Sequence, residues 1–280
     1  MQNIQIKNLI VEFDLLNVDG NVISKKRAID GISLSIEKGE FVCILGRNGS
    51  GKSTFAKCLN ALILPTEGDV IINGMNTKDE AKTIDIRKNI GMAFQNPDNQ
   101  IVASIVEEDI AFGMENLGID SKTMDKRIDE ALESLGIKDL RYSMTSKLSG
   151  GQKQKVSIAG IIAMKSKIIV LDEPTSMIDK NGRKDLLDKV KKLNKEENIT
   201  VILISHYVEE ISYADRVLLF SNGKVLADDT PKNIVLEKEK LEEAGIILPY
   251  IPKLASKLKE SGKNLKGNEF TIDEICQSLK

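Results

Sequence analysis

The 280-residue sequence has little cysteine, no long apolar run and no excess of charge of either sign. Its three cysteines, Cys43, Cys58 and Cys276, lack metal-ligand spacing, so no disulfide framework is expected and a reducing cytosol fits. No apolar run approaches the ~18 residues of a membrane span, and the N-terminus MQNIQIKNLI lacks a signal pattern. Because 40 basic residues balance 42 acidic ones, no nucleic-acid partner is expected. We expect a chain that is soluble by itself, so that any membrane role would come through a partner.

A glycine-rich loop follows directly on an apolar run. Residues 41–45 (FVCIL) are continuously apolar, as in a strand buried on both faces, and a helical pattern begins at Lys52. The loop between them, GRNGSGKST, matches the phosphate-binding pattern G-x-x-x-x-G-K-[ST]. Lys52 would reach the β- and γ-phosphates of a nucleotide, and Ser53 would bind Mg²⁺. The predicted phosphate-binding residues are Gly46, Asn48, Gly49, Ser50, Gly51, Lys52, Ser53 and Thr54.

Further apolar strands are each followed by a polar side chain. The strand at 168–171 ends in Asp172, which can hold a metal-bound water, and in Glu173, which can orient or deprotonate an attacking water. The only histidine, His206, follows the strand at 201–205. A lone histidine is more often structural, but its place past a strand end at the same sheet edge favours a functional role.

The stretch Leu148 to Gln152, LSGGQ, adds a second motif to the phosphate loop. Together they resemble the ATP-binding-cassette (ABC) ATPases, in which the LSGGQ of one subunit caps the γ-phosphate held by the other. The resemblance implies ATP and Mg²⁺ as ligands. It gives the capping role to Ser149, Gly150, Gly151 and Gln152.

The same resemblance assigns roles to four residues that would mean little alone. Gln95 would contact Mg²⁺ and the water, His206 would contact the γ-phosphate, and Asp179 would lie in a loop that crosses to the partner subunit. Phe13 stands where the family commonly has a tyrosine that stacks on adenine; a core strand residue is the alternative interpretation. The predicted metal ligands are Ser53, Gln95 and Asp172.

A finer resemblance runs through FQNPDNQ at 94–100, VEEDIAFG at 106–113 and LSGGQKQKVSIAG at 148–160. These segments are similar to the ATPases of energy-coupling factor (ECF) transporters, which import vitamins and transition-metal ions. The resemblance implies a second ATPase, identical or paralogous, a membrane-embedded T subunit that docks near residues 95–115, and a substrate-capture S subunit. It places the chain on the cytoplasmic face of the cell membrane. The transported substrate is not encoded in any of these motifs.

The expected fold is α/β: a P-loop NTPase (RecA-like) core with an antiparallel β-subdomain and an α-helical subdomain at about 96–165. Residues 1–230 would form the nucleotide-binding domain and 231–280 a helical extension that pairs two ATPases. Alternating strands are predicted at 4–13 and 32–36, joined by a polar loop from Asp14 to Arg27. Its cluster Lys25-Lys26-Arg27 is interpreted as a solvated surface, with a phosphate or lipid contact as the alternative.

Two other functions remain open. A soluble ABC ATPase of DNA repair or cofactor assembly would share both motifs, but the segment between loop and LSGGQ has no sustained heptads for the long coiled coil of the repair proteins. A GTPase would need an Asn/Thr-Lys-x-Asp motif, to which Thr77-Lys-Asp-Glu80 is only a near match.

Overall fold

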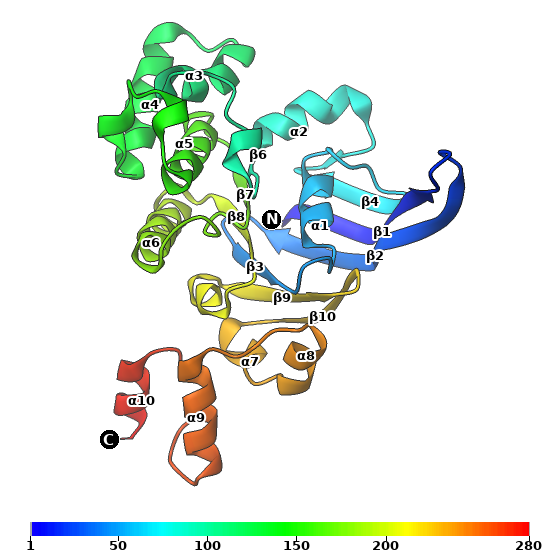
Figure 1. Ribbon diagram of the computed structural model, residues 1–280, viewed down its shortest axis with the longest axis vertical. Helices are drawn as coiled ribbons and strands as arrows, with labels where there is room; N and C mark the ends of the chain where they lie inside the picture. Colours follow the sequence, from blue (N-terminus) through cyan, green and yellow to red (C-terminus); the bar gives the residue numbers. More distant parts are fainter. Residues whose placement is uncertain (1, 280) are drawn as a thin grey trace.

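The computed structural model describes residues 2–279 and contains two β-sheets packed against each other (Figure 1). The first is antiparallel, in the order β2-β1-β4-β5. The second has the order β10-β9-β3-β8-β7-β6 and is parallel except for its edge strand β10. The first sheet comprises β1 (Gln2–Leu16), β2 (Val22–Glu37), β4 (Glu67–Ile72) and β5 (Met75–Asn76). The second comprises β3 (Phe41–Leu45), β6 (Ile90–Ala93), β7 (Ile168–Asp172), β8 (Thr200–Ser205), β9 (Arg216–Ser221) and β10 (Lys224–Asp229).

The parallel sheet is covered on both faces, which explains its unbroken apolar strands. Every residue of β3, β7 and β8 is buried. One face packs on α1 (Lys52–Leu59) and on the antiparallel sheet, where Phe55 and Phe220 meet edge to face with ring centroids 5.3 Å apart. The other face packs on α6 (Lys180–Glu197) and on a helical lobe. The predicted α/β core and antiparallel subdomain are both confirmed.

The helical lobe contains α3 (Val106–Asn116), α4 (Ser121–Ser134) and α5 (Gly150–Ala163), at the upper left of Figure 1. The buried residues of α3 and α4 recur at helical spacing, because one face of each packs on its neighbours, whereas α5 is buried over most of its surface. Arg141 ties the lobe together, donating to Glu107 at 2.9 Å, to Asp129 at 2.7 Å and to Asp125. A short helix, α2 (Thr83–Asn89), precedes β6.

The prediction of a polar loop from Asp14 to Arg27 is wrong. Strands β1 and β2 continue as a hairpin arm as far as the pair Leu16 and Val22, and only residues 17–21 form the turn (Figure 1). There Asn17 and Asn21 close the turn with a 2.9 Å backbone bond. The arm has no buried face to impose an alternation of apolar and polar residues, so its sequence does not read as strand.

Between β10 and residue 279 the structure contains the helices α7 (Pro231–Ile234), α8 (Lys238–Glu243), α9 (Tyr250–Glu260) and α10 (Ile272–Ser278). Residues from Ile234 to Ile246 pack into the same core as the parallel sheet. Helices α9 and α10 project away at the bottom of Figure 1 around a small core of Ala255, Leu265 and Ile275. In and next to α10, Ile275 is buried while Ile272 and Leu279 are exposed. No helix within residues 2–279 is long and apolar enough to span a membrane.

The central strand β8 should carry much of the stability. Ile202 in β8 is fully buried, whereas Ile23 on the arm is 65% exposed. We expect Ile202→Ala to lower the free energy of unfolding by about 2–5 kcal/mol, because it leaves a cavity in a packed core. The matched substitution Ile23→Ala should change it by less than about 0.5 kcal/mol. Urea unfolding followed by circular dichroism measures both, and equal losses would contradict the assigned core.

Candidate nucleotide-binding site

The phosphate loop joins the end of β3 to the start of α1, so its backbone surrounds the positive end of a helix. Gly49 and Gly51 have φ of 81° and 104°, a region that favours glycine. At Gly46, a Cβ atom would lie 2.5 Å from the carbonyl oxygen of Phe220, so the loop also needs glycine where it passes β9. The sequence pattern therefore reflects backbone geometry that other residues would disturb.

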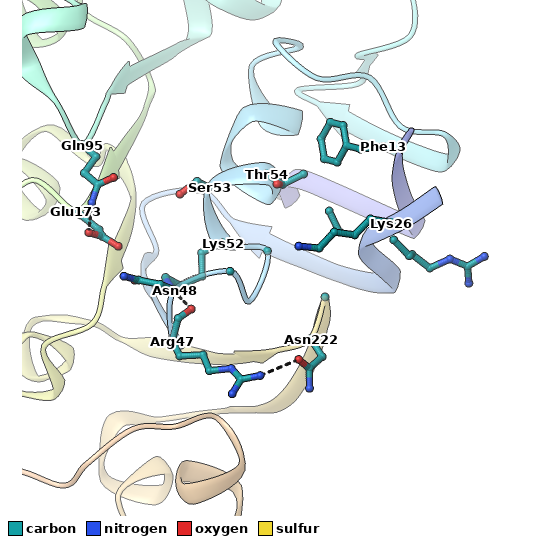
Figure 2. A pocket seen from close by; sticks show the side chains of 15 residues that line it. Phe13, Lys26, Arg47, Asn48, Lys52, Ser53, Thr54, Gln95, Glu173 and Asn222 are labelled. Carbon is teal, nitrogen blue, oxygen red and sulfur yellow. Dashed lines mark hydrogen bonds between the residues drawn. The ribbon is translucent and has the colours of Figure 1, made fainter. Parts of the chain in front are cut away.

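The Lys52 side chain folds back over this loop and is hydrogen-bonded to its backbone. Its ammonium donates to the carbonyl oxygen of Gly46 at 2.7 Å. It also donates to that of Arg47 at 3.0 Å (Figure 2). Burial lowers the pKa of this ammonium below its ordinary value, and the nearby carboxylates of Glu173 and Asp172 act in the opposite direction. The Lys52 ammonium is buried and, within residues 2–279, hydrogen-bonded only to carbonyl groups, so it can still form an ion pair with the phosphates of a bound ligand.

Ser53 and Asp172 bring α1 and β7 together at the mouth of the loop. The Ser53 hydroxyl donates to the Asp172 carboxylate at 3.1 Å. Burial raises the pKa of Asp172 above its ordinary value, since the carboxyl group has little contact with solvent. The predicted pair of oxygen ligands is thus adjacent in space, although 119 positions apart in the sequence.

Two further strand ends place side chains next to Glu173. Gln95, after β6, donates from its amide nitrogen to Oε2 of Glu173 at 2.7 Å (Figure 2). His206, after β8, places Nδ1 3.4 Å from the same oxygen. The backbone of Glu173 has a φ of 50°, and its N–H donates to Ile204 at 3.0 Å, which fixes the turn that presents the carboxylate. The structure therefore brings the three predicted catalytic side chains together.

A cavity of about 820 Å³ opens over the loop. Phe13, 41% exposed on β1, lies at one side, while Gln95 and Glu173 lie beyond the loop at the other (Figure 2). The remaining lining residues are Lys26, Arg27, Ala28, Arg47, Asn48, Gly49, Gly51, Lys52, Ser53, Thr54, Asn222 and Gly223. Of the other loop residues, Gly46 and Ser50 are buried behind this surface.

The LSGGQ segment does not line this cavity. Ser149 caps α5 through reciprocal bonds with Gln152, at 3.3 Å and 2.9 Å. Gly150 and Gly151 lie against Met177 and Ile178, so the segment sits beside the predicted crossing loop that ends at Asp179. Ser149 and Asp179 are both exposed. One chain therefore presents the phosphate loop and the LSGGQ segment as two separate surfaces.

Sequence reasoning missed several cavity residues. Lys26, Arg27 and Ala28 had been placed in or beside a loop, whereas they belong to β2. Asn222 and Gly223, in the turn between β9 and β10, also reach the cavity, where Asn222 accepts a 3.3 Å bond from Arg47. The signal available for Lys26 was its place in the basic cluster; nothing in the sequence distinguished Asn222 from any other turn residue.

The donor set at the loop suits Mg²⁺ together with a nucleotide. Hydroxyl, carboxylate and amide oxygens, the ligands this ion prefers, are offered by Ser53, Asp172 and Gln95. Within residues 2–279 no group of three or more His, Cys, Asp or Glu side chains forms a metal site. Mg²⁺ commonly keeps several waters and binds through one or two carboxylates together with substrate phosphates.

Comparison with known proteins identifies the class. Residues 29–176 match the family model described as "ABC transporter", and the chain belongs to this family of ATP-binding cassettes. It is an ATPase of this family. It is also 51% identical to the "Energy-coupling factor transporter ATP-binding protein EcfA1" of Clostridioides difficile (strain 630), over 91% of this chain and 92% of that protein. A protein of the same description from Clostridium novyi (strain NT) is 45% identical, over 99% and 97% of the two chains.

The chain thus belongs to the energy-coupling factor transporter ATP-binding proteins, and the resemblance predicted from its motifs is confirmed. Solved structures agree with this. CbiO1 of Clostridium perfringens, described as part of the ABC transporter complex CbiONQ, has a TM-score of 0.75 and 30% identity, over 92% of this chain and 99% of that one. The cassette MJ0796, in a dimeric post-hydrolysis state with ADP and Pi, has a TM-score of 0.74 and 28% identity, over 81% and 98%.

Asp172 should destabilise the nucleotide-free protein. Its pKa in the folded state lies above the ordinary value of 3.8, so the folded state holds the proton more tightly than the unfolded state and ionisation disfavours folding. We expect Asp172→Asn to raise the Tm at pH 7 in EDTA. This gain should shrink as the pH falls through the folded-state pKa towards 3.8.

Differential scanning calorimetry at several pH values measures this gain. The exposed Asp19, at the tip of the arm, provides the control, and Asp19→Asn should leave the Tm unchanged. A lower Tm for Asp172→Asn at pH 7 would contradict the destabilising role.

Proposed function

We propose that this chain is the ATP-hydrolysing subunit of an ECF importer, and that it binds MgATP between its own phosphate loop and the LSGGQ segment of a second cassette. The observation that carries the proposal is the cavity over the loop, which has the lysine and the catalytic carboxylate but lacks the LSGGQ segment of the same chain. The γ-phosphate side of the site is completed by Ser149, Gly150, Gly151 and Gln152 of that second subunit.

Different residues of the chain bind the nucleotide, hold the metal ion and activate the attacking water. Phe13 stacks on adenine, while the amides of the loop residues from Gly46 to Thr54 and the Lys52 ammonium bind the phosphates. Mg²⁺, held by Ser53, Asp172 and Gln95, would neutralise charge on the β- and γ-oxygens. Glu173 orients a water molecule for in-line attack on phosphorus and accepts its proton as the bond to the β-phosphate oxygen breaks.

Gln95 and His206 fix Glu173 for this role. Their contacts with Oε2, at 2.7 Å and 3.4 Å, leave Oε1 for the attacking water. His206 also contacts the γ-phosphate once the two cassettes close. Because these groups follow three different strands, a movement of the loop after β6 changes the position of Glu173, and the movement of the cassettes thereby becomes coupled to hydrolysis.

Closing and opening follow from the shared nucleotide. ATP contacts both subunits in the closed dimer, so it shifts the equilibrium towards closure by the difference between its affinities for the closed and open states. Asp179, exposed beside the LSGGQ segment, crosses to the partner in the closed state. Loss of the γ-phosphate removes contacts to the second subunit, and the dimer opens.

The importer assignment adds two membrane partners: a T subunit, and an S subunit that captures vitamins or transition-metal ions. The chain then sits at the cytoplasmic face of the membrane and has no nucleic-acid partner. Two large apolar side chains near the predicted docking segment support this proposal, since Val102 and Phe112 are 62% and 48% exposed. Residues 231–280 extend the cassette of residues 1–230, and we assign to α9 and α10 the pairing of two ATPases.

The alternatives receive no support from the site. The near match to a GTPase motif begins at Thr77, which is buried, and continues into a 3-10 helix at Glu80–Lys82; none of it lines the cavity. This segment therefore offers no support for base recognition of the kind a GTPase uses. A soluble ABC ATPase would share the cavity, but the relatives that match over nearly the whole chain are transporter ATP-binding proteins.

Glu173→Gln should separate ATP binding from hydrolysis. We expect the hydrolysis rate to fall by about 10²-fold or more, since the general base is lost, while ATP still binds. A closed dimer should accumulate in size-exclusion chromatography with ATP and Mg²⁺. Lys52→Met, which removes the phosphate ligand, should elute as the nucleotide-free protein does. The same elution for Glu173→Gln with and without ATP would contradict the shared site.

Membrane partners can be tested at the exposed side chains of the helical lobe. Affinity purification of the full chain from detergent-solubilised membranes should recover two integral membrane proteins that stimulate its ATPase activity. Phe112→Glu should abolish their recovery and leave basal hydrolysis unchanged. Ile84→Glu, at a side chain 68% exposed on α2, is the matched control and should retain them. Hydrolysis indifferent to membrane proteins would favour the soluble alternative.

A further inference from the structure

We propose that Lys26 is a nucleotide ligand, and that its ammonium binds the phosphates next to the ribose. The inference rests on the nucleotide site of the proposed function and adds a residue to it. Lys26 lies on β2, outside every motif of the sequence, and it lines the cavity over the phosphate loop.

The register of the hairpin arm places Lys26 beside the base. Residues Phe13 and Lys26 are directly opposed across β1 and β2. Directly opposed residues of an antiparallel pair project from the same face of the sheet. Both line the cavity, and Figure 2 shows the Lys26 side chain extending from β2 towards the phosphate loop. A base stacked on Phe13 would therefore have this ammonium on its phosphate side.

The two neighbouring cations, Lys25 and Arg27, are not available to a ligand in the cavity in the way that Lys26 is. Arg27 is neutralised, since its guanidinium donates to Glu12 at 3.0 Å and to Asp30 at 2.8 Å. Lys25 is opposed to Asp14, on the other face of the arm, and does not line the cavity. Among residues 2–279, Lys26 has no carboxylate within ion-pair distance. It is the cation of the cluster that is free to meet an anionic ligand.

The division of the cavity indicates which phosphates Lys26 meets. The loop amides and Lys52 lie at the end near Glu173, where the β- and γ-phosphates bind. Phe13 and Lys26 lie at the opposite end, so the ammonium faces the α-phosphate and the adjoining β-phosphate oxygens. ATP and ADP have these groups in common. The contact therefore contributes equally to the binding of both nucleotides, and does not help to distinguish them.

A pair of charge reversals tests the inference. We expect Lys26→Glu to raise the Kd of ATP and of ADP by the same factor, about 5- to 20-fold, as a charge-assisted contact is replaced by repulsion. Lys25→Glu makes the same change in net charge one residue away and should raise both by less than about 2-fold, because an exposed charge on the far face is screened. Lys26→Arg should bind nearly as the natural chain does. Isothermal titration calorimetry in EDTA, which prevents hydrolysis, measures all three.

Three results would overturn the inference. Equal losses of nucleotide affinity for Lys26→Glu and Lys25→Glu would mean that the effect comes from the change in net charge and not from a direct contact. A loss of affinity confined to ATP would mean that Lys26 contacts the γ-phosphate instead. Unchanged affinity for both nucleotides would mean that Lys26 does not contact the nucleotide. Lys52→Met separates these failures from a failure of the site itself. If Lys52→Met still binds ATP as the natural chain does, the nucleotide site is misplaced; if it does not bind, only the role of Lys26 is at issue.

Discussion

The site depends on the convergence of four parallel strands at one edge of a buried sheet. The ends of β3, β6, β7 and β8 present the phosphate loop, Gln95, the acidic pair and His206. Parallel strands run in one direction, so their carboxyl ends lie side by side whatever their separation in the sequence. The fully apolar strands hold this edge in place, because each is packed on both faces.

This arrangement buries charges that water would otherwise solvate. Burial disfavours the charged forms of both Lys52 and Asp172, and the unusual backbone of Glu173 adds strain at the same place. A nucleotide with its metal ion would give each of these groups a partner of opposite charge. In our account, binding therefore relieves a local instability, and the second cassette supplies the contacts that one chain keeps on a separate surface.

Much of the site could be predicted from the sequence, because its motifs are local. The loop, the Asp172 and Glu173 pair and the residues after β6 and β8 each follow an apolar run that reads as a buried strand. The basic cluster indicates a phosphate contact for Lys26 only as an alternative, because its place in the cavity depends on cross-strand register. Asn222 could not be predicted, since it reaches the cavity through a hairpin turn that composition does not distinguish from others. The sequence of the arm predicts a loop, because neither of its faces is buried and no alternation of apolar and polar residues results.

The central claim is that each nucleotide is held by two cassettes. A structure of the Glu173→Gln assembly with ATP and Mg²⁺ tests it most directly. We expect the γ-phosphate nearest Lys52 to be bound also by an LSGGQ segment from the neighbouring cassette, with Ser149 of this chain at the neighbour's nucleotide. An ATP molecule whose γ-phosphate contacts one chain alone, with Ser149 remote from every phosphate, would contradict it.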